Sequence, residues 1–235
     1  MGGCADRTPP PGRRFRRDTE DDLSTEDDLM RALAPVVWIG GPPCAGKTSV
    51  ARQLADRYGL HAYHFDCHEA DHITRSSPAQ QPALHAFLKM TMDERWVLRS
   101  PREMAHTAIR SWTQRFPLVL EDLRALPTEP PIVAEGAGLF PEIVAPLVAS
   151  PHQAVWLVPT AAFCATMRRR RGSAMPAETS DPERAWCNLI DRDILLARYV
   201  RHRAVERGLA VIEIDGSRSI DEITTAVAGH VGLTP

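Results

Sequence analysis

Short apolar segments alternate with longer amphipathic segments along most of the chain after Pro35. The apolar runs predict strands at 36–39, 61–65, 131–135, 152–158 and 209–214. Val36-Val37-Trp38-Ile39 is apolar at every position, as expected of a central strand that is buried on both faces. The alternation therefore predicts an α/β fold, in which a mostly parallel five-stranded sheet lies between two layers of helices.

Helical periodicity fills the segments between these strands. The first predicted helix, 46–58, has Val50, Leu54 and Tyr58 on one stripe and ends at Gly59. The remaining periodic segments predict helices at 79–92, 101–115, 117–126, 163–171 and 219–229. Three of these lie between the second and third strands, within residues 67–130, a connection too long for a simple crossover. We therefore expect residues 67–130 to form a helical insertion that binds an acceptor.

Two polar segments depart from the alternating pattern. Residues 1–33 contain three consecutive prolines and, from Asp18 to Asp28, seven acidic residues in eleven positions. Such a segment buries too little apolar surface to fold, which predicts a disordered charged tail, with a short helix at 26–33 as an alternative for its end. Residues 172–187 include Gly, Ser and Pro without apolar periodicity and predict a mobile lid. The folded domain is expected to span 34–235.

Composition and charge exclude several classes of protein. The chain has 235 residues, of which 43% are hydrophobic and 25% charged, with a net charge of −2, as in ordinary globular proteins. No apolar run approaches the roughly 20 residues that span a bilayer, so we expect a cytoplasmic protein without a membrane partner. The near-neutral charge argues against nucleic acid as a partner. Five widely spaced cysteines without a CxxC pair favour reduced thiols.

A phosphate-binding loop follows the first predicted strand. The pattern G-x-x-x-x-G-K-[ST] is matched in full by Gly41, Pro42, Pro43, Cys44, Ala45, Gly46, Lys47 and Thr48, and Ser49 continues the site. The glycines allow backbone N–H groups to point inward, and the helix that begins at Gly46 adds the positive end of its dipole. The spacing therefore predicts a site for the phosphates of a nucleotide.

Two side chains of this loop have expected chemical roles. Lys47 is expected to reach the β- and γ-phosphates, and the Thr48 hydroxyl to hold Mg²⁺. Only Lys47 and Lys89 are lysines among the 28 basic residues of the chain. The lysine in the loop therefore stands where a compact ammonium is required. The cofactors expected are ATP and Mg²⁺.

With these features the sequence resembles the P-loop kinases of the nucleoside-monophosphate-kinase-like group, which includes antibiotic, sugar-acid and nucleotide kinases. The resemblance covers most of residues 35–230. It includes the loop at 41–48, the helical insertion, Glu135-Gly136 after the third strand, the arginine-rich helix 163–171, the lid and the terminal strand and helix. It implies a three-layer P-loop fold and transfer of the ATP γ-phosphoryl group to a small acceptor.

Two carboxylates at strand ends are candidate catalytic groups. Asp66 follows the second predicted strand, and the carboxyl ends of parallel strands open onto the ligand crevice, where Asp66 is expected to accept a proton from an attacking hydroxyl. A surface Asp that caps the next helix is the alternative. By resemblance, Glu135 corresponds to an acid–glycine pair that orders Mg²⁺ through water or contacts the acceptor. Glu replaces the more common Asp here, and a purely structural turn is the alternative.

Arginines supply the other candidates. The helix before the lid ends in four arginines, of which Arg168 and Arg171, three apart, lie on one face and are expected to neutralise the transferring phosphoryl group, as the resemblance implies. Arg192 and Arg198 are weaker candidates. A further set alternates with Trp96 and Trp112 and consists of Arg95, Arg99, Arg102 and Arg110. These four either bind an anionic or aromatic acceptor or pair with Glu94, Glu103, Glu121 and Asp122.

His68-Glu69-Ala70-Asp71-His72 matches the HExxH pattern of zinc proteases. No third zinc ligand is signalled, and the pattern begins two residues after a strand that lies beside the phosphate-binding loop. Incidental metal binding or substrate contact is therefore favoured over proteolysis.

The sequence thus predicts a Mg²⁺·ATP-dependent small-molecule kinase. Asp66 favours a hydroxyl acceptor, such as a nucleoside, sugar acid or antibiotic, whereas a nucleoside monophosphate would need arginines more than a base. A nucleotide-binding regulatory ATPase that acts through a protein partner is the alternative. Phosphorylation of polynucleotide ends would require a basic groove, which only the arginines at 168–171 begin to supply.

Overall fold

The computed structural model describes residues 28–172 and 175–233. Five parallel strands form one sheet in the order β2-β3-β1-β4-β5. Their bounds are β1 Val36–Gly40, β2 His61–His64, β3 Ile132–Gly136, β4 Ala154–Pro159 and β5 Ala210–Ile214. The prediction of a five-stranded parallel sheet is confirmed, and each strand lies within one or two residues of its expected bounds.

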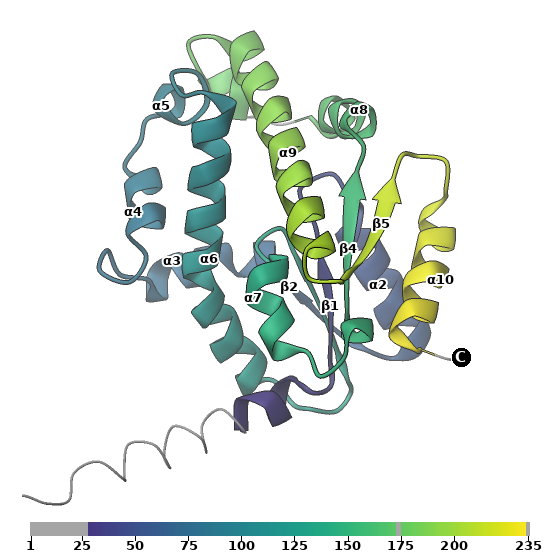
Figure 1. The fold of residues 1–235 in the computed structure, drawn as a ribbon. Coiled ribbons are helices and arrows are strands. Elements are labelled where there is room, and N and C mark those ends of the chain that lie inside the picture. Colours follow the sequence, from purple (N-terminus) through teal and green to yellow (C-terminus); the bar gives the residue numbers. More distant parts are fainter. Residues whose placement is uncertain (1–27, 173–174, 234–235) are drawn as a thin grey trace, which may run out of the picture.

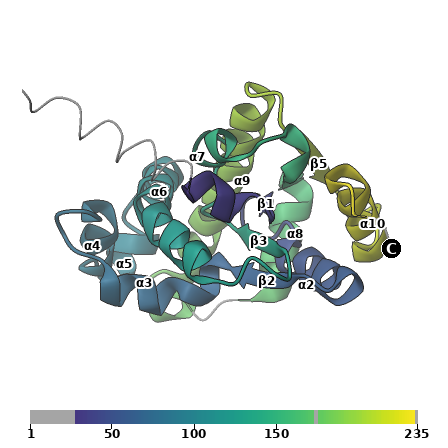
Figure 2. The ribbon, with the colours of Figure 1, turned by 90° about the horizontal axis from the view of Figure 1, so that it is seen from below.

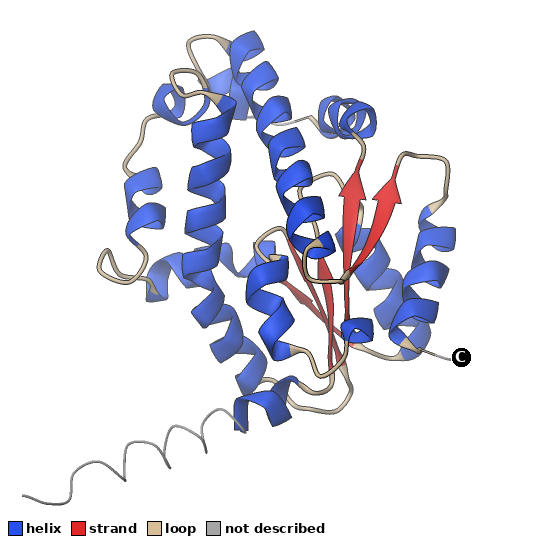
Figure 3. Ribbon diagram, in the orientation of Figure 1, coloured by secondary structure: helices blue, strands red, loops and turns tan. Residues whose placement is uncertain are grey.

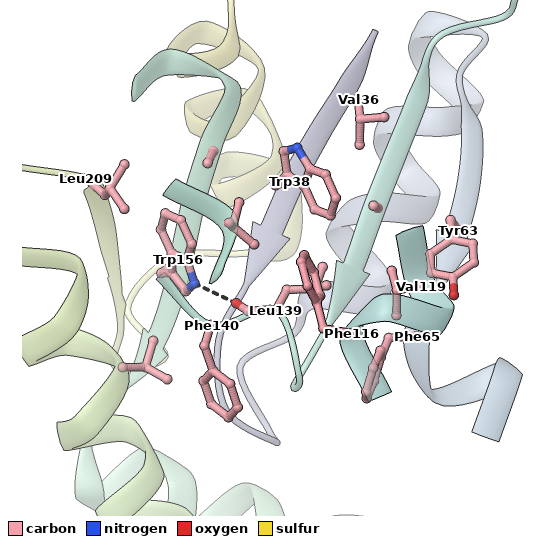
Figure 4. Packing of buried hydrophobic residues seen from close by; sticks show 14 of the residues in the cluster. Val36, Trp38, Tyr63, Phe65, Phe116, Val119, Leu139, Phe140, Trp156 and Leu209 are labelled. Atoms are coloured by element: carbon pink, nitrogen blue, oxygen red, sulfur yellow. Dashed lines mark hydrogen bonds between the residues drawn. The ribbon is translucent and has the colours of Figure 1, made fainter. Parts of the chain in front are cut away.

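Alternate residues of the central strands face two separate cores. From β1, Val36 and Trp38 belong to one core cluster, whereas Ile39 belongs to the other. All three are fully buried, which explains why this strand is apolar at every position. Figure 4 shows the first of these clusters, in which the Trp156 indole donates a hydrogen bond to the Leu139 carbonyl oxygen (2.9 Å).

Helices cover both faces of the sheet (Figures 1 and 3). One face is covered by α2 (Lys47–Tyr58) and α10 (Ile220–Val231), and the other by α6 (Pro101–Ala125), α7 (Pro141–Val144) and α9 (Pro182–Val205). Helix α8 (Ala161–Arg171) follows β4 directly at the carboxyl end of that strand. The result is the three-layer architecture that the sequence predicted.

The segment between β2 and β3 is helical but divided differently from the prediction. It contains a 3₁₀ turn, η1 (Phe65–His68), and helices α3 (Glu69–Arg75), α4 (Pro82–Leu88), α5 (Met92–Trp96) and α6. The helix expected at 79–92 is therefore shorter, and those expected at 101–115 and 117–126 are one helix that contains Pro117. Figures 1 and 2 place α4 and α5 on the side of α6 away from the sheet.

The ends of the expected tail and lid also have defined structure. The short helix considered at 26–33 is present over residues 28–33, and Leu33 is fully buried in the core cluster that contains Trp38. The rest of the expected tail, 1–27, lies outside the described residues. Within the expected lid, 173–174 also lie outside them, a short turn η4 occupies Met175–Glu178, and 182–187 form the first turns of α9.

The remaining short elements are two 3₁₀ turns, η2 (Ala145–Leu147) and η3 (Pro151–Gln153), which connect α7 to β4. Among the helices that the structure describes, none combines the length and the apolar character needed to cross a bilayer.

Candidate active site

The predicted phosphate-binding loop connects the end of β1 to the start of α2. Gly41 has a φ of 136°, and a Cβ atom there would lie 2.1 Å from the Leu157 carbonyl oxygen of β4, so only glycine fits. Pro42, Cys44 and Ala45 are buried and Pro43 is partly buried. The loop is therefore packed closely against β4, and its backbone has a positive φ at Gly41, Cys44 and Gly46.

Lys47 is the first residue of α2, and its side chain folds back over the loop. Only 7% of Lys47 is exposed, and Nζ donates a hydrogen bond to the Pro42 carbonyl oxygen (2.9 Å). Burial lowers the pKa of Lys47, while the charges of Glu135 and Asp66 oppose that shift and Arg171 adds to it. The Lys47 ammonium thus lies within electrostatic range of Glu135, Asp66 and Arg171, beside the loop that is expected to bind phosphates.

Thr48 and Glu135 meet beside the loop. The Thr48 hydroxyl donates to Glu135 Oε1 (3.0 Å), and the same oxygen lies 2.9 Å from His64 Nδ1 at the end of β2. Glu135 is 2% exposed, in β3 between these two partners. A hydroxyl and a carboxylate are the oxygen ligands that Mg²⁺ prefers, so this pair fits a magnesium ion. Thr48 and Glu135 are candidates from the sequence, whereas His64 belongs to no motif and is brought next to Glu135 only by the pairing of β2 with β3.

The glycines after Glu135 have a packing role. A Cβ atom at Gly136 would lie 2.3 Å from Cβ of Phe65, and one at Gly138 would lie 2.4 Å from Cζ of the same residue. The Phe65 ring therefore lies directly on this segment, which excludes any larger residue. Close packing on Phe65, and not contact with a ligand, accounts for both glycines.

Asp66 lies in η1, just beyond the end of β2, and not at the end of the strand itself. Its side chain is exposed, and its charge reaches Lys47. Phe65, the residue before Asp66, is held in place by Arg115 of α6. Arg115 is 1% exposed, lies over the Phe65 ring (4.2 Å) and donates to the Phe65 carbonyl oxygen (3.3 Å). This buried guanidinium fixes the turn that presents Asp66.

Asp66 also forms part of the wall of a large cavity. The cavity has a volume of about 690 Å³, a size typical of small-molecule sites. Its walls come from η1, α3, α4, α5, α6 and α9, and three aromatic rings, Phe87, Trp96 and Trp112, contribute to them. The segment expected to bind an acceptor therefore encloses a cavity next to the phosphate-binding loop.

Arg168 is part of a buried charge cluster between α8 and α9. Asp193, which is fully buried, accepts hydrogen bonds from Arg168 Nε (2.8 Å) on one oxygen and from Arg192 NH2 (2.7 Å) and Nε (3.0 Å) on the other. Arg192 lies over the Trp96 ring (5.3 Å) and lines the cavity, whereas Arg168 lies on α8. One carboxylate thus links an arginine of α8 to an arginine of the cavity wall. Asp193 carries no signal in the sequence, because only the packing of α8 on α9 brings it to Arg168.

The other arginines of this region are exposed. Arg171 is the last residue of α8; burial lowers the pKa of Lys47, and the positive charge of Arg171 lowers it further. Arg169 lies 3.9 Å from Glu183. Arg198 is exposed on α9, away from the cavity wall. The structure therefore brings Asp66, Glu135 and Arg171 within electrostatic range of Lys47, whereas Arg168 is paired with Asp193.

The HExxH residues belong to a hydrogen-bonded network and not to a zinc site. His72 is fully buried; its Nε2 lies 2.8 Å from Asp122, and its Nδ1 lies 3.2 Å from Arg115 NH2. Arg115 can only donate, so Nδ1 accepts and Nε2–H donates, which leaves no lone pair for a metal. Asp71, His72 and Asp122 place ligand atoms within 4.8 Å of one another, but Arg75 bonds both carboxylates. A guanidinium already supplies the positive charge of this cluster.

Comparison with known proteins finds similar folds only among solved structures. No protein-family model and no curated protein matches the chain. Shikimate kinase from Acinetobacter baumannii in complex with shikimate is 17% identical, with a TM-score of 0.39 over 84% of this chain and 94% of that one. Deoxyadenosine kinase from M. mycoides with bound dATP is 10% identical, with a TM-score of 0.45 over 84% of this chain and 99% of that one. The YorR protein from Bacillus subtilis in complex with phosphorylated GDP is 16% identical, with a TM-score of 0.42 over 84% of this chain and 96% of that one.

Proposed function

We propose that this protein is a Mg²⁺·ATP-dependent phosphotransferase that moves the γ-phosphoryl group of ATP to a hydroxyl group of a small molecule. The observation that supports it most is the position of Asp66, which lies in the wall of the 690 Å³ cavity while its charge reaches Lys47 of the phosphate-binding loop. A nucleotide held by the loop and an acceptor held in the cavity would meet at Asp66.

The residues around this point suit phosphoryl transfer, which depends mainly on positioning and on neutralising charge. Loop amides and Lys47 bind the phosphates, and Asp66 accepts the proton of the attacking hydroxyl as the bond to phosphorus forms and the bond to the leaving ADP oxygen breaks. Thr48 and Glu135 would hold Mg²⁺, which when bound neutralises charge on the β- and γ-phosphates. Arg171 is placed to neutralise charge on the transferring group.

The test is ADP release from Mg²⁺·ATP, measured against a panel of hydroxyl-bearing small molecules, with mass spectrometry of the products. Stimulated ADP release, together with an acceptor that gains one phosphate, is expected. Slow hydrolysis that no acceptor stimulates, without any phosphorylated product, would overturn the proposal and favour a regulatory ATPase that acts through a protein partner.

Site variants test the assigned roles. Lys47→Ala is expected to lower kcat/KM by about 10²-fold or more, because one preorganised charge is lost. Asp66→Asn is expected to lower kcat by about 10²-fold or more with little change in the KM for ATP. The matched controls are Lys89→Ala, at the other lysine, and Asp71→Asn, at an exposed carboxylate that does not line the cavity. Full activity of Asp66→Asn would remove Asp66 as the base.

A further inference from the structure

Two arginines of the cavity wall, Arg95 and Arg99, form no ion pair with a carboxylate of residues 28–172 or 175–233. Arg95 Nε and NH2 donate to the carbonyl oxygens of Phe87 (3.2 Å) and Leu88 (2.8 Å). Arg99 NH2 donates to the Glu103 carbonyl oxygen (2.8 Å) and to the Thr107 hydroxyl. Backbone carbonyls and a hydroxyl orient a guanidinium without neutralising its charge. Both guanidinium groups are therefore fixed in place. Hydrogen bonds from Ser100 lower the pKa of the nearby Glu103 carboxyl and the Arg99 charge lowers it further, but that carboxylate bonds Ser100 and not Arg99.

The acids of the same segment are engaged elsewhere. Glu94 and Glu103 form capping boxes with Thr91 and Ser100 at the starts of α5 and α6, so their oxygens bond the backbone at these helix ends. Glu121 and Asp122 pair with Arg75. The sequence left two alternatives open for these arginines, an anionic acceptor or ion pairing with these acids. In the structure, neither Arg95 nor Arg99 pairs with any of the four acids.

The other charges in the wall are compensated. Arg192 is paired with Asp193, and Glu69 lies 3.5 Å from Arg115. Asp66, the proposed base, remains at one end of the cavity. Within the described part of the chain, the charged groups of the cavity wall that form no ion pair are therefore one carboxylate, Asp66, and two guanidinium groups, Arg95 and Arg99.

The two kinds of charge lie at different levels of α6. Arg99 contacts Thr107, whereas the turn that presents Asp66 is bonded to Arg115, eight residues further along the same helix. At 1.5 Å per residue, these levels are about 12 Å apart along the helix axis. Apolar residues of the wall, among them Ile73, Leu84 and Trp112, lie in the helices that form the cavity. The cavity thus has a basic end, an apolar body and an acidic end beside the phosphate-binding loop.

We propose that the acceptor is an anionic molecule that places a carboxylate or phosphate group on Arg95 and Arg99 and its reacting hydroxyl at Asp66, with an apolar or aromatic body between the two. Guanidinium groups match the planar or bidentate geometry of these oxyanions. The inference rests on the proposed function, because that function makes the cavity the acceptor site. It narrows the acceptors to acids and excludes neutral compounds of the same shape.

Binding without ATP tests this independently of phosphoryl transfer. Isothermal titration calorimetry of the full chain would compare indole-3-lactate with indole-3-lactamide, and thymidine 5′-monophosphate with thymidine. The anionic member of at least one pair is expected to bind about tenfold or more tightly than its neutral partner. The first pair reports a carboxylate ligand and the second a phosphate ligand. Equal binding or a neutral preference in both pairs, or no binding of either anion, would overturn the proposal.

Single variants identify the residues responsible. Arg95→Gln and Arg99→Gln are each expected to reduce the preference for the anion about tenfold, whereas Arg102→Gln, an exposed arginine outside the cavity wall, should leave it unchanged. Arg95→Lys and Arg99→Lys keep the charge and should retain part of the preference even if the glutamine variants fold poorly. An unchanged preference in folded Arg95→Gln and Arg99→Gln proteins would overturn the proposal. ADP release stimulated only by neutral acceptors would overturn it too, while leaving the kinase activity in place.

Discussion

Cys44 has a backbone conformation that glycine adopts more readily than any other residue. Its φ is 67°, and it is the one non-glycine residue with a positive φ among those the structure describes. A side chain in this region costs about 1–2 kcal/mol. We expect Cys44→Gly to be more stable than Cys44→Ala by about 1 kcal/mol, because both lose the thiol but only glycine removes the strain. Denaturant unfolding measures the difference, and a more stable alanine variant would contradict it.

Because His72 is fully buried, we expect the protein to lose stability in mild acid. Burial lowers the pKa of His72, and the neighbouring charges of Arg115 and Arg75 lower it further, against the opposing effect of Asp122. The unfolded chain therefore takes up a proton below about pH 6.5 that the folded protein excludes, so stability falls as the pH falls through that value. The slope from this group is at most about 1.4 kcal/mol per pH unit.

Urea unfolding between about pH 7.5 and pH 5.5 measures this slope. His72→Asn is expected to show a shallower dependence than the wild type, whereas the exposed His61→Asn should keep the wild-type slope. Equal slopes for wild type and His72→Asn would show that another group is responsible.

Single residues could be predicted from sequence where their position along the chain determined their neighbours. The phosphate-binding loop is a local motif that connects β1 to the helix carrying Thr48, and Glu135 lies in β3, which pairs with β1, so the parallel sheet brings the two side chains together. The partners of Arg168 and His72 could not be predicted. Asp193 is 25 residues from Arg168, and Asp122 is 50 residues from His72, so only the packing of helices determines these pairs.

Among the elements, α6 is the one whose extent the sequence misrepresents. Pro117 suggested two helices because proline removes a backbone donor and costs about 3 kcal/mol inside a helix. The observed helix continues through it, since Phe116, Val119 and Leu123 around it are buried against the sheet. Tertiary packing of this face outweighs the local cost, and a sequence pattern does not show what a helix packs against.

A fully buried carboxylate, Asp193 of α9, binds an arginine of α8 and an arginine of its own helix. Asp193→Asn would leave Arg168 and Arg192 without a balancing charge in a buried position, which costs about 3–5 kcal/mol. We expect a loss of that order in denaturant unfolding. Glu183→Gln, at an exposed pair on the same helix, should cost less than about 1 kcal/mol. Similar small losses for both variants would show that the buried cluster contributes little to stability.

At the scale of the whole molecule, the helix before β1 is part of the folded domain. Gln153 Nε2 donates to the Ala34 carbonyl oxygen (2.9 Å), and Ile132 N donates to that of Pro35 (3.1 Å), so the backbone after this helix is bonded to both η3 and β3. The charge pattern of residues 18–28 suggested a tail that continued to residue 33, because one buried leucine is a weak signal beside many acids.

Leu33 tests where the domain begins. It is fully buried in the core cluster that contains Trp38, and Leu33→Ala removes its side chain from that core, which is expected to lower the free energy of unfolding by about 2–5 kcal/mol. Leu98→Ala is the matched control, because Leu98 is 67% exposed and should change stability by about 0.5 kcal/mol or less. Denaturant unfolding of both variants decides the matter. A Leu33→Ala protein as stable as Leu98→Ala would return the boundary to residue 34, where the sequence alone placed it.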